Sequence, residues 1–177
     1  VSLYDINKDR IQNIQKKGGI QLTGKLNGFG KLSCITTNIQ EAIQNANIVM
    51  VTTTANAHKI VANDIADLIE EEQIIVLNPG RTCGALIFRQ TLIEKKINKK
   101  YYLGEAQTLV YACRLIESGH VNIIGIKDKV LLCALPASDT AYVIEKIHSL
   151  FPCFTECKNV LVTSLENYGA VFHPSVV

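Results

Sequence analysis

The sequence predicts an α/β fold with a doubly wound, mainly parallel sheet, and three observations support this. Short apolar runs alternate with amphipathic stretches, as in sheets whose parallel strands are joined by helices. The clearest apolar runs, residues 48–52 and 74–77, are nearly continuous, which is typical of strands buried on both faces. A helical pattern follows each of these runs, so we expect helices to cover the sheet.

Composition excludes several classes of protein. The 177 residues are 47% hydrophobic and 19% charged, so the chain is globular and not disordered. Lys and Arg number 18 against 16 acidic residues, a balance that favours neither nucleic acid nor a membrane surface as partner. The apolar runs are far shorter than the ~20 residues of a spanning helix, and we expect a cytoplasmic protein. The six cysteines are scattered without a C-x-x-C motif, which predicts reduced thiols and no metal site.

The elements of the first third follow from turn and cap residues. Residues 2–4 form a short strand that ends at Asp5, and a helix over 7–17 stops at Gly18 and Gly19. Turn residues amid alternating apolar positions predict an antiparallel hairpin within 20–35. Thr37 and Gln40 form a capping box for a helix that reaches residue 46.

The remaining elements continue the alternation. Helices are expected over 58–69, 85–97 and 139–150, with a strand near 101–103. Two further strands, 121–126 and 130–135, suggest a hairpin around the polar residues 127–129. The last segment, 159–177, begins an element that does not finish within the sequence.

Asp5 is the first candidate binding residue. An acid that closes the second strand of a dinucleotide-binding fold accepts hydrogen bonds from ribose hydroxyls, about 20 residues after a glycine-rich turn. The chain contains no G-x-G-x-x-G, and only four residues precede Asp5. Asp5 is therefore either an ordinary turn residue, or the first strand and phosphate loop lie outside this sequence.

Two polar loops follow the two buried strands. Residues 52–58 are small and polar, and residues 78–84 contain Asn78, Pro79 and Arg81. Because ligands bind beyond the carboxyl ends of parallel strands, both loops would face one crevice. Arg81 precedes a helix, where an anion is favoured. Each loop taken alone could be a plain turn with a solvated charge.

Other polar residues lie in apolar surroundings. Glu105 and Arg114 fall within an apolar run, so they are either a structural ion pair or functional groups. His173 precedes Pro174 and could exchange a proton near neutral pH, with Asn167 as a hydrogen-bonding partner. The alternative for His173 is a capping or packing role.

Taken in order, the segments resemble the NAD(P)-dependent opine dehydrogenase family, which includes octopine and nopaline dehydrogenases. The matching pieces extend over almost the whole chain and form a fairly specific ordered set. They are residues 3–5, 18–20, 46–51, 57–58, 77–82, 84–86, 105–108, 111–114, 135–137 and 167–174.

The resemblance implies an architecture and an activity. Residues 1–158 would be an incomplete Rossmann-type NAD(P)-binding domain that lacks its first βα unit, and 159–177 would begin a helical domain. The implied activity is an oxidoreductase that uses NAD(P)H to condense an amino acid reductively with a 2-oxo acid. Two alternatives stay open: a ketopantoate-reductase-like or hydroxy-acid reductase, and a non-catalytic dinucleotide-binding module.

The same resemblance assigns roles to residues. His173 would be the catalytic acid/base with Asn167 beside it, and Arg81 would lie near the substrate. The cofactor crevice would be lined by Asp5, Thr53, Thr54, Asn78 and Pro79.

The remaining expectations concern selectivity and partners. Asp5 favours NAD over NADP because it repels a 2′-phosphate, and Lys8 and Arg10 reduce that preference. The partners implied are the amino acid and the 2-oxo acid, and a homodimer is compatible with the resemblance. The chain departs from the family pattern at Thr54, Cys83 and Ile87, where proline, glycine and an acid are common, which leaves the substrate class open.

Overall fold

The computed structural model describes residues 1–166, and its contacts divide the chain into two compact units. The first unit comprises residues 1–46 and 111–127, and the second comprises residues 47–110 and the described residues from 128 to 166. Each unit is built from segments that are distant in the sequence, because the chain leaves the first unit after residue 46 and returns to it at residue 111.

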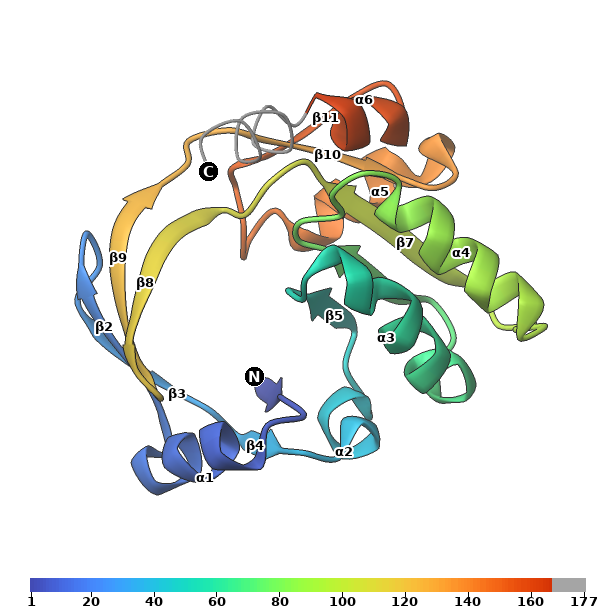
Figure 1. Cartoon of the computed structure of the whole chain (residues 1–177). Helices are drawn as coiled ribbons and strands as arrows, with labels where there is room; N and C mark the ends of the chain where they lie inside the picture. The colour runs from blue at the N-terminus through green and yellow to red at the C-terminus, as the bar shows by residue number, and fades with distance from the viewer. Residues whose placement is uncertain (167–177) are drawn as a thin grey trace. The chain divides into compact units, whose positions relative to one another are not determined.

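The first unit contains two small sheets. Strands β1 (Ser2–Tyr4) and β4 (Cys34–Thr36) pair in parallel. A second sheet has the order β3-β2-β9-β8 (Figure 1). Its strands β2 and β3 form the antiparallel hairpin predicted within 20–35, and β8 and β9 form another. The bounds are Gly19–Gly24 for β2, Gly28–Lys31 for β3, Tyr111–Glu117 for β8 and His120–Ile126 for β9.

Helix α1 (Lys8–Lys17) of the first unit begins and ends where its cap residues predict. The Asn7 side chain accepts a hydrogen bond from the Arg10 amide, and Gly18 ends the helix in the left-handed region at φ 71°. Ile11 and Ile14 are its buried residues. The short helix α2 (Ile39–Ile43) is capped by Asn38 and not by the predicted Thr37.

The second unit is built on a five-stranded sheet of order β11-β10-β7-β6-β5, in which β5, β6 and β7 run parallel. Strand β10 is antiparallel to β7 and parallel to β11. The strands are β5 (Ile48–Val51), β6 (Gln73–Leu77), β7 (Tyr101–Ala106), β10 (Val130–Ala134) and β11 (Phe154–Glu156). All of β6 is buried, as the continuous apolar run predicts.

Helices cover both faces of this sheet, which confirms the doubly wound prediction. Alternate residues of β6 and β7, such as Ile74, Val76 and Tyr102, pack with Val143 and Ile147 of helix α5 (Thr140–Ile147). The residues between them face the side on which α4 (Gly84–Glu94) begins, and α3 (His58–Ile65) packs beside α4 (Figure 1). Helix α6 (Val160–Leu165) follows β11. Short 3-10 turns at Ala55–Ala57, Ala66–Leu68 and Ala137–Asp139 complete the unit.

One predicted hairpin is wrong. Both strands expected around residues 127–129 exist, but β9 belongs to the four-stranded sheet and β10 to the five-stranded sheet. The hairpin partner of β9 is β8, across a turn in which Gly119 has φ 79°, and β2 pairs with the other edge of β9. Residues 127–129 therefore lie where the chain passes from one unit to the other.

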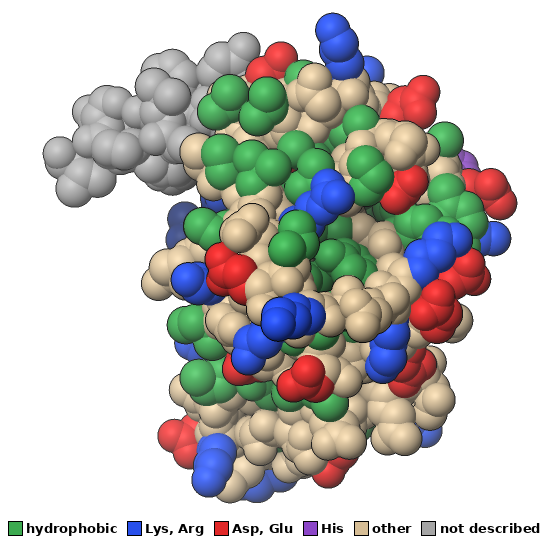
Figure 2. Space-filling model, turned by 90° about the vertical axis from the view of Figure 1, so that its right-hand side faces the viewer, with side chains coloured by type: hydrophobic (Ala, Val, Ile, Leu, Met, Phe, Trp, Pro, Cys, Tyr) green, Lys and Arg blue, Asp and Glu red, His purple; other side chains and the backbone are tan. Residues whose placement is uncertain are grey.

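The surface of the described residues carries both hydrophobic and charged side chains (Figure 2). No helix within residues 1–166 is long and apolar enough to cross a membrane. Ile60 of α3 and Ile87 and Ile93 of α4 are about half exposed or more. Figure 2, which views the molecule from the side of these helices, shows hydrophobic side chains interspersed with charged ones.

Candidate functional site

The candidate site lies at the carboxyl edge of the parallel strands in the second unit. Val51 is in register with Leu77, so β5 and β6 end side by side and the two polar loops begin from neighbouring positions. The Asn78 amide donates to the Val51 carbonyl at 2.8 Å, which extends the pairing by one residue. The expectation that both loops share one edge is confirmed.

The loop after β5 is exposed and held by its own short-range contacts. Thr53 and Thr54 are both exposed to solvent. The Thr54 hydroxyl donates to Asn56 Oδ1 at 2.6 Å, and the Thr54 carbonyl accepts from the Ala57 amide. The loop is therefore held by contacts within itself, and both threonines remain exposed to solvent.

The loop after β6 has an unusual backbone. Arg81 and Cys83 have positive φ values of 56° and 60°, in the left-handed region. This conformation costs an L-residue roughly 1–2 kcal/mol, so the surroundings must hold it. Glycine adopts it freely, so a glycine at position 83 would form this loop at a lower cost in free energy than Cys83 does.

Two buried side chains beside this loop carry polar atoms that lack hydrogen-bond partners among residues 1–166. Asn78 is 5% exposed, and its Oδ1 atom accepts no hydrogen bond from the described residues. His58 is fully buried at the start of α3, and neither ring nitrogen makes a hydrogen bond of ordinary geometry within residues 1–166. Burial lowers the pKa of His58, and the Pro79 carbonyl opposes this shift in part. The imidazole is therefore neutral near pH 7.

Glu105, in β7, lies beneath the same loop and is fully buried. Its carboxylate accepts hydrogen bonds from the Ala85 amide at 2.8 Å and from the Thr163 and Ser164 hydroxyls at 2.7 and 2.6 Å. Burial raises the pKa of Glu105, and these three donors act in the opposite direction. Arg114, the ion-pair partner considered from the sequence, lies in the exposed strand β8, and the contacts of Glu105 are to other groups.

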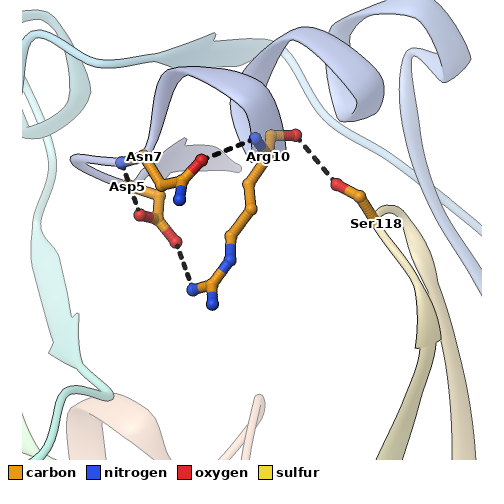
Figure 3. A network of polar contacts seen from close by, with 4 residues as sticks. All are labelled: Asp5, Asn7, Arg10 and Ser118. Atoms are coloured by element: carbon orange, nitrogen blue, oxygen red, sulfur yellow. Dashed lines mark hydrogen bonds and ion pairs between the residues drawn. The ribbon is translucent and has the colours of Figure 1, made fainter.

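Asp5 follows β1 in the first unit and is held by its neighbours in the chain (Figure 3). Its Oδ1 accepts from the Asn7 amide at 2.8 Å, and its Oδ2 lies 3.5 Å from Arg10 Nη1. The Arg10 carbonyl accepts from the Ser118 hydroxyl. A basic group therefore stands beside the acid that the sequence assigns to ribose binding.

The structure thus groups most of the predicted site residues. Thr53, Thr54, Asn78, Pro79 and Arg81 lie on the two adjacent loops of the second unit, whereas Asp5 belongs to the first unit. His173 and Asn167, the predicted catalytic pair, lie outside the described residues.

Sequence reasoning missed the residues that hold the second loop. Thr163 and Ser164 of α6 bond Glu105, and Ser164 also accepts from the Cys83 amide at 3.1 Å. Nothing in the spacing of a Thr-Ser pair distinguishes it from an ordinary helix surface. The useful signal was Glu105 itself, an acid within an apolar strand, which requires donors from somewhere in the fold.

Known proteins similar to this chain are opine dehydrogenases. The opine dehydrogenase of Arthrobacter sp. (strain 1C) is 36% identical over 175 residues, which cover 98% of this chain and 48% of that protein. The octopine dehydrogenase of Mizuhopecten yessoensis is 25% identical over 169 residues, which cover 93% of this chain and 40% of that protein. The chain therefore spans about half the length of the curated relatives it matches. No family model matches the sequence.

Solved structures agree on the fold. An octopine dehydrogenase structure with NADH and pyruvate superposes with a TM-score of 0.80 at 21% identity, and the match covers 99% of this chain and 48% of that one. A ketopantoate reductase from Ralstonia eutropha JMP134 gives 0.65 at 15% identity, over 88% of this chain and 48% of the other. The Rossmann-like fold and the resemblance to opine dehydrogenases are confirmed.

Proposed function

We propose that the protein containing this chain is an opine-dehydrogenase-type oxidoreductase, which uses NAD(P)H to condense an amino acid with a 2-oxo acid. The observation that carries the proposal is the pair of polar loops at the adjacent carboxyl ends of β5 and β6. The 36% identity to an opine dehydrogenase over 98% of the chain supports it.

The residues present fit a dinucleotide. Among the described residues no donor reaches the buried acceptor Asn78 Oδ1, which an amide or hydroxyl hydrogen of a bound group would satisfy. Thr53, Thr54 and Pro79 would line the crevice beside it, and Asp5 would accept from ribose hydroxyls. When bound, the reduced nicotinamide supplies the hydride.

Cofactor preference depends on the Asp5 and Arg10 pair. The Asp5 carboxylate repels a 2′-phosphate, which favours NAD, whereas Arg10 beside it can contact such a phosphate. Both side chains are partly exposed, so their mutual attraction is worth only about 0–1 kcal/mol, and Arg10 is free to turn toward a ligand. We propose that NAD is preferred by a small margin and that NADP is also accepted.

Replacing Arg10 with alanine tests this assignment. The catalytic efficiency with NADPH should fall by about tenfold, since one charge-assisted hydrogen bond is lost, while efficiency with NADH should hold or rise. Lys16→Ala, an exposed charge on the same helix, is the matched control. Equal losses with both cofactors would show that Arg10 does not discriminate between them.

Arg81 is proposed to receive a substrate carboxylate, because the amino acid and the 2-oxo acid each carry one and Arg81 stands before the N-terminus of α4. His173 is proposed as the acid/base that gives a proton to, or takes one from, the nitrogen or oxygen atom bonded to the carbon that receives the hydride. Asn167 is proposed as its hydrogen-bonding partner.

Residues 159–177 are proposed to begin a helical domain after the nucleotide-binding domain of residues 1–158. A cytoplasmic location and a homodimer belong to the same proposal.

The test is NAD(P)H oxidation by the protein expressed from its complete gene. We expect oxidation only when a 2-oxo acid and an amino acid are both present. His173→Ala should abolish turnover and leave cofactor binding intact. Oxidation with a 2-oxo acid alone would indicate a hydroxy-acid or ketopantoate-type reductase. Dinucleotide binding without turnover on any substrate pair would indicate a non-catalytic module.

A further inference from the structure

Glu105 is a buried carboxylate that the proposed reaction does not use. None of the ion pairs formed within residues 1–166 involves it. An acid in such a place is costly unless its oxygens are well bonded, and a neutral side chain could fill the same volume. Its partners therefore indicate what it does.

Those partners belong to the loop after β6 and to the two helices beside it. Glu105 Oε2 accepts from the Ala85 amide at 2.8 Å, in the first turn of α4, where a negative charge is favoured. Its Oε1 accepts from the Ser164 hydroxyl of α6 at 2.6 Å. One carboxylate thus joins β7, α4 and α6.

Ser164 extends this connection into the loop. Its oxygen accepts from the Cys83 amide at 3.1 Å, so its single hydroxyl proton is directed to Glu105. Cys83 is one of the two loop residues in the left-handed conformation. The serine hydroxyl therefore links Glu105 to the Cys83 backbone, which adopts the left-handed conformation two residues after Arg81.

Direct packing completes the arrangement. A Cβ atom at Gly80 would collide with the Glu105 side chain, so the loop backbone rests directly on the carboxylate. The Gly80 amide donates to the Ala106 carbonyl at 3.0 Å, next to Glu105 in the chain. Arg81 thus lies between two anchored points, Gly80 on one side and Cys83 on the other.

From these contacts we propose that Glu105 is a positioning residue, which fixes the loop of residues 79–83 through Ala85 and Ser164 and so orients Arg81 toward a carboxylate substrate. The substrate part rests on the function proposed above. The anchoring part concerns the loop alone and is measurable without turnover.

Three variants of the protein expressed from its complete gene test the proposal. Ser164→Ala removes only the hydroxyl between Cys83 and Glu105, and Glu105→Gln keeps the shape but loses one acceptor site. Thr91→Val is the control, since Thr91 is buried in α4 and its hydroxyl donates to the Ile87 carbonyl and not to the loop. If Glu105→Gln fails to fold, Ser164→Ala still decides the outcome.

Two readouts are needed. Amide hydrogen exchange of residues 80–85 should accelerate at least about tenfold in Ser164→Ala and Glu105→Gln and stay unchanged in Thr91→Val. The KM for the 2-oxo acid should rise about tenfold or more while the Kd for NADH changes less than about twofold. The reason is that Ser164 holds Cys83, beyond Arg81, whereas the Gly80 amide next to Pro79 keeps its bond to the Ala106 carbonyl.

Unchanged exchange and unchanged KM in both variants would overturn the proposal. Faster exchange with an unchanged KM would overturn the assignment of Arg81 to a carboxylate and leave the anchoring intact. If the unmodified protein shows no reductive condensation, the proposed function fails, and hydrogen exchange still decides whether Glu105 anchors the loop.

Discussion

At the scale of single residues, Cys83 shows how the surroundings hold a side chain in a backbone conformation that disfavours it. Cys83 occupies a left-handed conformation that glycine would adopt without strain. The Cys83 amide is held by Ser164, so the loop keeps its shape despite the side chain. A glycine at position 83 would therefore lower the free energy needed to form the loop and could keep the same hydrogen bond to Ser164.

Substitutions at this position should follow the backbone rule. We expect the free energy of unfolding of Cys83→Gly to equal or exceed that of the unmodified protein. That of Cys83→Val should be lower by about 1–2 kcal/mol, because β-branched residues tolerate positive φ least. Urea denaturation of the three proteins measures the difference. Equal stability of the glycine and valine variants would show that the left-handed conformation is not adopted.

His58 should make the fold sensitive to acid. Its pKa in the folded protein is lowered from 6.5, so the unfolded chain binds more protons below that pH. Its effect on the free energy of unfolding is therefore absent well above pH 6.5 and becomes destabilising as the pH falls below it. The loss of stability between pH 7.5 and pH 5.5 should be smaller in His58→Leu than in the unmodified protein. A loss of the same size in both proteins would contradict a buried neutral imidazole.

At the scale of elements, local signals located most helices and strands but did not assign the strands to sheets. Gly18 and Asn7 mark the ends of α1 because cap chemistry is local. The strands on either side of residues 127–129 were expected to pair, yet β9 and β10 belong to different sheets. The tight turn at Ser118 and Gly119 was the correct hairpin signal, and it competed with a polar tripeptide that resembles a turn equally well.

The end of α1 offers a clean test of cap chemistry. A Cβ atom at Gly18 would contact nothing within 4 Å. The free energy of unfolding of Gly18→Ala should therefore fall by only about 1 kcal/mol, the cost of a left-handed conformation for alanine. Gly18→Asn should lose less, because asparagine tolerates this conformation. At Gly19 a Cβ atom would collide with the Gly30 carbonyl, and Gly19→Ala should lose more than Gly18→Ala in the same urea titration. The reverse order would contradict the described hairpin.

At the scale of the whole molecule, the sequence was sufficient to predict the fold class and the edge of the sheet at which both polar loops begin. Buried strands and polar loops alternate visibly, and parallel strands bring their carboxyl ends together by geometry. The hydrogen bonds beneath the loop could not be predicted from the sequence, because Glu105 and Ser164 are 59 residues apart and meet only through tertiary packing. The roles of His173 and Asn167 rest on the resemblance and stay predictions.

The length of 177 residues is best compared with the lengths of the similar proteins. The chain covers about half of each curated relative, so the proposed activity is that of the protein that contains this chain. The second unit nevertheless carries both loops, the buried acceptor of Asn78 and the Glu105 network. Much of the proposed cofactor and substrate contact is therefore present in the described residues.

The identity of the product tests the central claim most directly. The protein expressed from its complete gene is incubated with NADH or NADPH, a 2-oxo acid and a ¹⁵N-labelled amino acid, and the products are analysed by mass spectrometry. The account predicts one secondary amine that contains both carbon skeletons and retains the ¹⁵N label. Formation of a 2-hydroxy acid without the label, or no reduced product with any substrate pair, would contradict it.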